Sequence, residues 1–261
     1  MTSAKRFLKP FLVMSGLGML GILCLVPTMR NAAELVRGLP DAADLPASAL
    51  VALLLVQPTI LLLAGVAAGV ALAEKAGLTS LILRGVRGEA SPTAAGAWGS
   101  TLVLAVLVAS ATAAADLVFR KTFPAAFAGL PRLDDVTWHG RLLGLLYGGV
   151  TEELMMRFGL MTLLLWAGLL LTGGRGRSLL VWLSIVLSAL AFAAAHLGVL
   201  AGAAPADHAV IIARTLSLNG ILGLLFGWLY ARRSLEHAML AHAASHAIFW
   251  TATPFLVALG L

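Results

Sequence analysis

Long apolar runs, separated by short polar segments, recur along the whole chain. Each run is about 17 residues or longer, close to the ~20 that a helix rising 1.5 Å per residue needs to cross a ~30 Å hydrocarbon core. The runs do not alternate with a period of two, which argues against a β-barrel. Because helices satisfy their own backbone groups in lipid, the pattern predicts an all-α, polytopic transmembrane helical bundle. We expect about seven spans, over residues 11–27, 45–73, 95–119, 141–171, 178–202, 208–231 and 234–256.

Composition agrees with a multi-pass membrane protein. Hydrophobic residues make up 60% of the 261 residues and charged residues 11%, whereas a soluble domain has about 25% charged residues. The net charge of +6 lies in no basic, aromatic-rich soluble segment. We therefore expect the basic residues to interact with the lipid bilayer of the plasma (inner) membrane. We expect no nucleic-acid partner.

The N-terminal 27 residues place basic residues before an apolar run, as a signal peptide does. No small-x-small cleavage pattern follows Pro27 before Arg30, so we expect an uncleaved first span. The single cysteine, Cys24, excludes an intrachain disulfide.

The positions of Lys and Arg suggest an orientation. With alternating spans, ten fall at the end of the bundle that carries the N-terminus and six at the opposite end, which favours a cytoplasmic N-terminus. The ten are Lys5, Arg6, Lys9, Lys75, Arg84, Arg87, Arg175, Arg177, Arg232 and Arg233, and the six are Arg30, Arg37, Arg120, Lys121, Arg132 and Arg141.

Polar residues divide the chain unequally. Residues 1–120 predict N-terminal transmembrane helices with few polar interruptions, and residues 121–140 an interfacial linker. For residues 141–261 we predict a four-helix part that holds most of the intramembrane ionisable groups. We expect the active site in this part. No strong internal repeat supports an inverted-repeat transporter.

Two adjacent glutamates lie in the apolar setting "GVTEELMMRFG", residues 149–159. Glu153 and Arg157 are four positions apart, so on a helix they share a face and can form an ion pair. Glu152 points about 100° away and has no such local partner, so it could act as a general base. The alternative is that Arg157 clamps both glutamates in a purely structural role.

Three histidines lie in the later spans. Phe192 and His196 are one turn apart in "AFAAAHLG", and His242 and His246 have the same spacing in the last span. A single intramembrane histidine often serves only to hydrogen-bond one helix to another. Three histidines and two glutamates on three spans instead favour a functional site. Counting back from the nearest span ends places them at similar depth, which predicts a water-filled cavity toward the end opposite the N-terminus.

Other polar residues have simpler explanations. Asp116 and Arg214 lie near span ends, where we expect their side chains to snorkel toward water. We expect His139 and His237 to be interfacial and not catalytic.

Together these residues resemble the CPBP family, which comprises the CAAX prenyl endopeptidases and the bacteriocin-processing or immunity-associated intramembrane proteases. The resemblance rests on Glu152-Glu153-x-x-x-Arg157, Phe192-x-x-x-His196 and His242-x-x-x-His246, in this order on separate spans. It covers about residues 141–250.

The resemblance implies an intramembrane endopeptidase of CAAX endopeptidase type, a hydrolase that is either glutamate-dependent or a metalloprotease. It implies that Glu152 and His196 activate water, that His242 and His246 stabilise the oxyanion, and that Glu153 and Arg157 support them. The partner would be a membrane-associated protein or peptide substrate, with or without a lipid anchor.

His246 stands where this family often has Asn. A neutral histidine can still donate to an oxyanion, and we expect that no cofactor is required. The substitution also leaves a zinc site open, with Glu152, His196, His242 and His246 as the ligands. Two other functions stay open as well: a proton- or ion-coupled membrane transporter, and a non-catalytic membrane scaffold or immunity protein.

Overall fold

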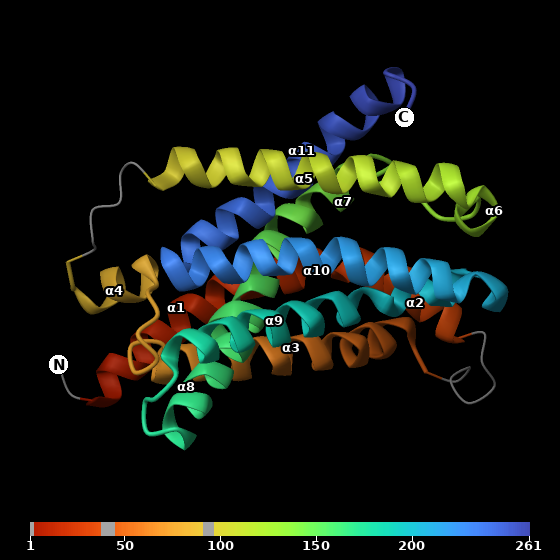
Figure 1. The fold of residues 1–261 in the computed structure, drawn as a ribbon. Helices are drawn as coiled ribbons and strands as arrows, with labels where there is room; N and C mark the ends of the chain where they lie inside the picture. Colours follow the sequence, from red (N-terminus) through yellow and green to blue (C-terminus); the bar gives the residue numbers. More distant parts are fainter. Residues whose placement is uncertain (1–2, 38–44, 91–96) are drawn as a thin grey trace.

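The computed structural model describes residues 3–37, 45–90 and 97–261, and 85% of the protein is helical, without strands in the described ranges (Figure 1). The first part contains α1 (Ser3–Cys24), α2 (Val26–Arg37), α3 (Ala47–Leu72), α4 (Leu81–Arg87), α5 (Ala97–Thr122) and α6 (Pro124–Phe127). The second contains α7 (Trp138–Leu143), η2 (Gly144–Glu152), η3 (Leu154–Met161), α8 (Thr162–Leu171), α9 (Arg177–Ala195), η4 (His196–Gly202), η5 (Pro205–Asp207), α10 (His208–Arg232) and α11 (Leu235–Ala258). The predicted all-α bundle is confirmed.

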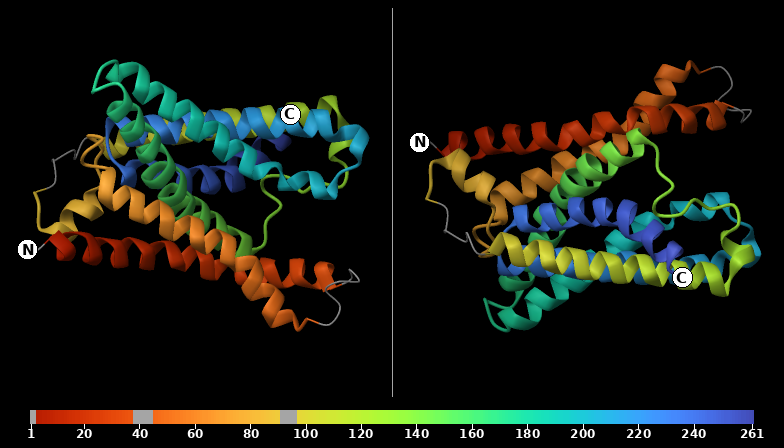
Figure 2. Two further views of the ribbon diagram at one scale, coloured as in Figure 1. Left: turned by 90° about the horizontal axis from the view of Figure 1, so that it is seen from below. Right: turned by 90° about the horizontal axis from the view of Figure 1, so that it is seen from above.

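Within the described residues, six helices are long and apolar enough to cross a membrane. They are Arg6–Cys24, Ala47–Leu72, Ala97–Thr122, Trp138–Leu171, Arg177–Ala201 and Pro205–Arg232. The last expected span, 234–256, forms the 24-residue helix α11 but is not among the six, because its histidines lower its hydropathy. This helix crosses the bundle and packs against α5, η2 and α10 (Figures 1 and 2).

The fourth span is continuous from α7 to α8, but its middle is wound as a π-helix on both sides of Glu153. Periodicity cannot distinguish this winding from an α-helix over so short a stretch. The π-helical segments also touch the N-terminal helices, since η2 packs on α1 and η3 on α3. Thr151 donates to the carbonyl of Gly18 at 2.7 Å across the first of these contacts. The centre of the bundle is therefore built from both halves of the chain.

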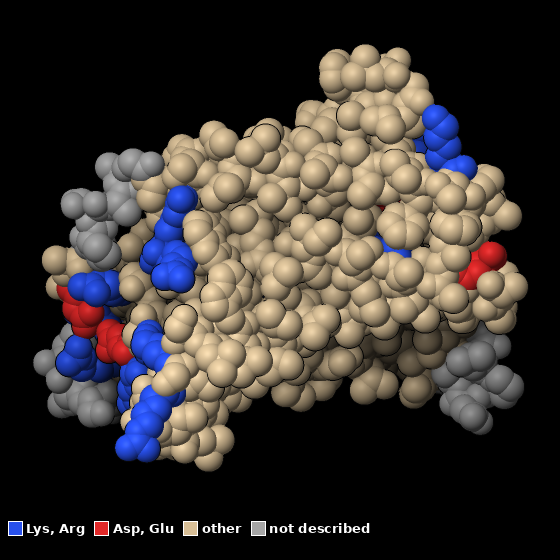
Figure 3. Space-filling view, viewed as in Figure 1, with Lys and Arg blue, Asp and Glu red and all other residues tan. Residues whose placement is uncertain are grey.

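Basic side chains gather at the end of the bundle that carries the N-terminus (Figure 3). Contacts between distant segments hold them there. Arg6 pairs with Glu89 at 2.8 Å, and Arg177 donates to the carbonyl of Ala76 at 2.8 Å. Arg233 donates to the carbonyl of Ala97 at 2.7 Å. The structure thus brings these groups to one end, as the alternating-span count predicted.

Glu236 fastens the last helix to the short helix α4 at the same end. Its carboxylate accepts hydrogen bonds from the Ser80 hydroxyl at 2.6 Å and from the backbone amides of Leu81 and Ile82 at 2.8 and 2.9 Å. These amides belong to the first turn of α4, where helix N–H groups have no partner in their own helix. One carboxylate therefore caps α4 and fixes where α11 begins.

Replacing Glu236 by Ala should lower the free energy of unfolding by about 1–3 kcal/mol, because the partly buried donors lose their acceptor. Thermal unfolding of the purified variant in detergent measures this. The matched control is Glu34→Ala, since Glu34 makes an exposed pair with Arg37 and should change stability little. Equal melting temperatures for the two variants would contradict the capping role.

Candidate active site

The adjacent glutamates of the fourth span face different surroundings. Glu153 is completely buried, whereas the side chain of Glu152 is 17% exposed and lines a cavity. Successive residues on a helix point in different directions, so neighbours in sequence need not share an environment. The expected separation of the two carboxylates is confirmed.

Arg157 is buried at the junction of three helical elements. Its Nη1 lies 3.1 Å from Glu153 Oε1 in an ion pair with both side chains fully buried. Its Nη2 donates to the carbonyl of Gly223 on α10 at 3.1 Å. Its guanidinium also lies 4.6 Å from the ring centre of Phe192 and 5.3 Å from that of Phe226. Arg157 therefore pairs with Glu153 as predicted and also joins η3 to α9 and α10.

His242 lies between the two glutamates. Its Nδ1 is 2.8 Å from Glu153 Oε1, and its Nε2 is 3.8 Å from Glu152 Oε2. The Phe226 ring stacks on it at 4.5 Å between ring centres. Because a carboxylate accepts, Nδ1 carries the hydrogen, and neutral His242 turns the lone pair of Nε2 toward Glu152. Glu153 thus sets the tautomer of His242.

His196 occupies the point where α9 ends and the 3-10 helix η4 begins. Its Nδ1 donates to the carbonyl of Phe192 at 2.8 Å, since a carbonyl oxygen can only accept. Its ring also packs edge-on against Phe192, with 4.7 Å between centres. The helix end therefore fixes the ring and leaves Nε2 as a lone pair.

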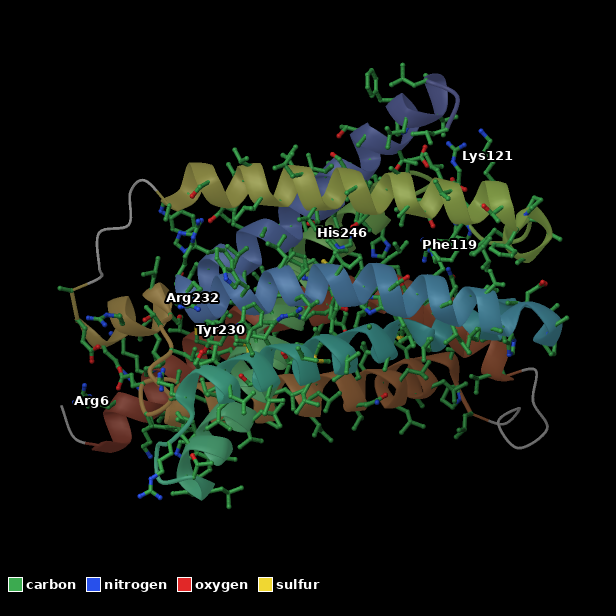
Figure 4. All side chains as sticks on the ribbon, viewed as in Figure 1. Arg6, Phe119, Lys121, Tyr230, Arg232 and His246 are labelled. Atoms are coloured by element: carbon green, nitrogen blue, oxygen red, sulfur yellow. The ribbon has the colours of Figure 1, made fainter. Side chains whose placement is uncertain are left out.

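His246 depends on a glycine across the interface with the fourth span. A Cβ added to Gly148 would lie 2.6 Å from His246 Nε2 and 3.3 Å from His242 Nε2, so only glycine leaves both rings where they are. The ring of His246 stacks on His242 at 5.3 Å between centres. Figure 4 shows His246 in the middle of the bundle, far from the basic end marked by Arg6 and Arg232.

Glu152, His196 and His246 line one cavity of about 520 Å³. It extends from these three residues toward Arg120, Pro131 and Arg132, at the end opposite the N-terminus. The expected cavity is confirmed, and its position agrees with the depth estimate. Glu153 and Arg157, which come from the same span as Glu152, have no exposed surface.

The residues proposed as zinc ligands do not form a metal-binding group. In the described ranges, no three His, Cys, Asp or Glu side chains come close enough together to hold a metal ion. Glu152, His196, His242 and His246 are neighbours, and the hydrogen bonds made by the Nδ1 atoms of His196 and His242 leave their Nε2 atoms free. It is the spacing of these side chains, and not the state of their ring nitrogens, that does not fit a zinc site in the described residues.

The expectation that Asp116 and Arg214 snorkel to water is wrong. Asp116 is completely buried and pairs with both Arg120 and Arg214. Arg214 comes from α10, 98 positions along the chain, and its charge is satisfied inside the bundle because the tertiary fold supplies a partner there. No local spacing could have revealed this pair.

Two further details differ from the simplest interpretation of the sequence. The linker contributes Leu130, Pro131, Arg132, Leu133 and Val136 to the cavity wall. His237 is buried, with a hydrogen bond of 2.9 Å to Ser234 and a stacked contact of 3.9 Å with Trp98. It lies away from the cavity, as expected for a non-catalytic residue, but it is not exposed at an interface.

At the mouth of the cavity, Arg132 is already paired. Its Nε and Nη2 donate to the two carboxylate oxygens of Asp134 at 3.0 and 2.7 Å. The hydrogen bond from Arg132 lowers the pKa of Asp134 from its usual value. This bidentate pair neutralises the charge of Arg132 at the rim.

Residues 135–248 match the family model of the Rce1-like type II CAAX prenyl endopeptidases. This part of the chain is similar to that family. It contains all six residues singled out from the motifs, so the resemblance noted in the sequence is confirmed over the region that carries it. Comparison with curated proteins and with solved structures gave no match. The Rce1-like match supports a multi-pass membrane protein that acts as an endopeptidase on a protein substrate.

Replacing Arg157 by Ala should damage the fold more than Glu152→Gln does. Removing a partner of a buried ion pair typically costs 3–5 kcal/mol, because Glu153 stays buried without its cation. Glu152 borders the cavity, where water can solvate the substituted amide. Yield and thermal stability of the two purified variants, measured side by side, test this. If both variants unfold at the same temperature, Arg157 does not hold the helices together.

Proposed function

We propose that this protein hydrolyses a peptide bond within the membrane, with Glu152 and His196 activating the attacking water. The observation that carries the proposal is that Glu152, His196 and His246 line one cavity inside the bundle. Peptide hydrolysis needs a base for the water and donors for the oxyanion, held in a site that excludes bulk solvent. A transporter or scaffold would not need this set in one place.

In the proposed reaction, a water bound beside Glu152 gives up a proton to its carboxylate. His196 accepts a hydrogen bond from the other O–H of that water through Nε2, since its Nδ1 is engaged with Phe192. The hydroxide attacks the carbonyl carbon of the scissile bond and forms a tetrahedral oxyanion. Glu152 then delivers its proton to the leaving nitrogen as the C–N bond breaks, so the carboxylate is regenerated.

His246 is the proposed main donor to the oxyanion. Its ring nitrogens make no hydrogen bond to any described residue, so the tautomer with Nε2–H is free to form. His242 can donate through Nε2 only as the imidazolium, because its Nδ1–H is directed at Glu153. Glu153 would stabilise that cation, and Arg157 holds Glu153 in place through their buried ion pair. We propose no metal in the reaction, since the donor set does not fit one.

Glu152→Gln and His196→Ala should each lower proteolysis by about 10²–10⁴-fold and leave insertion and folding intact. The measurement compares the membrane proteome of cells that express the wild type with that of cells that express each variant, and searches for new peptide termini. Controls are Glu34→Gln, exposed on α2, and His208→Ala, which does not line the cavity. Wild-type-like cleavage by either variant would remove that residue from water activation.

The residue at position 246 separates oxyanion donation from metal binding. If His246 only donates, His246→Asn should keep most of the activity and His246→Ala should lose about 10²–10³-fold, the usual cost of one oxyanion donor. Chelator treatment of the wild type should then change nothing. An inactive His246→Asn variant, together with chelator-sensitive activity that zinc restores, would establish a metal site instead.

A further inference from the structure

Of the three histidines in the proposed site, only His246 has a ring that makes no hydrogen bond to a described residue. The rings of His196 and His242 are each fixed through Nδ1, one by a backbone carbonyl and the other by Glu153. The χ2 torsion of a histidine has a broad, roughly two-fold preference, so hydrogen bonds or packing must choose between the ring orientations. For His246, labelled in Figure 4, packing alone makes this choice.

Two aromatic rings flank His246 along α11. His242 lies four positions before it, with 5.3 Å between the ring centres and 15° between the planes. Trp250 lies four positions after it, with 6.4 Å between the centres and 32° between the planes. Residues four apart lie one above the other on a helix face, so these rings cover opposite sides of the imidazole. Phe249 adds an edge-on contact at 6.1 Å. The imidazole therefore cannot turn about its Cβ–Cγ bond without displacing a neighbour.

The fourth span closes a further side of the ring. A Cβ added to Gly144 would lie 2.9 Å from both Cγ and Nδ1 of His246, and one added to Gly148 would lie 2.6 Å from its Nε2. The second of these positions is also 3.3 Å from Nε2 of His242. The Nε2 atoms of the two histidines therefore lie close to one place beside Gly148. An oxyanion site needs its donors to converge in this way, and a half-turn of the His246 ring would put a carbon in place of Nε2.

Trp250 is itself held by a residue outside α11. The guanidinium carbon of Arg141 lies 5.5 Å from the centre of the Trp250 ring. A cation within about 6 Å of an indole face is attracted by the quadrupole of the ring. Arg141 lies in the last turn of α7, where the fourth span begins, and Trp250 lines the cavity together with His246. A chain of contacts thus runs from the start of the fourth span to the proposed oxyanion donor.

We propose that Trp250 is a positioning residue that keeps Nε2 of His246 directed at the substrate oxyanion, and that Arg141 holds Trp250 in place. This rests on the proposed peptidase function and names the group that orients the histidine at position 246. A catalytic side chain works only within a narrow range of orientations, so a ring without a hydrogen bond needs neighbours that lock its rotamer. Trp250 touches no reacting atom in this assignment and acts through the imidazole.

The first test measures the His246 ring without any substrate. The full-length protein, labelled with ¹³C at the ε1 position of histidine, is studied by NMR in nanodiscs, and the His246 signal is identified by its absence in His246→Asn. In Trp250→Leu this signal should shift, because the ring current of the indole is lost. In Trp250→Phe the shift should be smaller, because an aromatic face remains. The control is Trp182→Leu, since Trp182 is 45% exposed on α9 and should leave the His246 signal unchanged.

The second test asks whether Trp250 acts through His246. The search for new peptide termini in the membrane proteome is repeated with Trp250→Leu, His246→Asn and the double variant. Trp250→Leu should lower cleavage about tenfold, less than the 10²–10³-fold that loss of an oxyanion donor typically costs, and Trp250→Phe should keep most of the activity. In the His246→Asn background, Trp250→Leu should change cleavage little, because the ring that it positions is absent. Thermal unfolding shows whether each variant still folds.

The outcomes separate this proposal from the proteolytic function. An unchanged His246 signal in Trp250→Leu, undiminished cleavage by that variant, or the same fold-loss in both backgrounds would overturn the positioning role. If Trp250→Leu does not fold, Arg141→Gln replaces it: the His246 signal should shift there too, and an unshifted signal would overturn the role. A shifted His246 signal, combined with no Glu152-dependent cleavage by the wild type, would keep the packing of the ring and overturn the peptidase.

Discussion

The ion pair between Glu153 and Arg157 lies where neither side chain has any exposed surface. A charge in such a place is costly unless a partner and further hydrogen bonds offset its desolvation. Arg157 meets this need with Glu153, the carbonyl of Gly223 and two aromatic rings. The same Glu153 accepts from His242 and sets its tautomer. The helix contacts and the orientation of the site thus depend on one pair of opposite charges.

The cavity shows how identical side chains come to serve different purposes. Glu152 and Glu153 are adjacent, yet one borders a cavity and the other is completely enclosed. The buried one contacts Arg157 and His242, which leaves Glu152 as the carboxylate that borders the cavity. Close packing reinforces this arrangement, because Gly148 leaves no room for even a methyl group beside the histidines.

The cavity also extends beyond the stretch that matches the Rce1-like family. Thr112 and Arg120 line it from α5, and Leu25 lines it next to α1, all before residue 135. The helices before residue 135 therefore also contribute to the cavity wall. Arg120 in particular joins α5 to the linker over the cavity mouth through the carbonyls of Leu130 and Pro131.

Local patterns in the sequence determined the helical class, most of the spans and the pairing of Glu153 with Arg157, because length, hydropathy and four-residue spacing act over short distances. The motifs also pointed to the six residues that the fold brings together. Only the tertiary structure decided the π-helical winding around Glu153, the tautomers of His196 and His242, and the burial of Asp116 between two arginines. The tautomer of His242 and the burial of Asp116 depend on which side chain from a distant segment lies opposite, whereas His196 bonds the carbonyl of Phe192 one turn earlier in its own helix. Such a partner, 98 positions away for Asp116 and Arg214, leaves no periodic mark in the sequence around either residue.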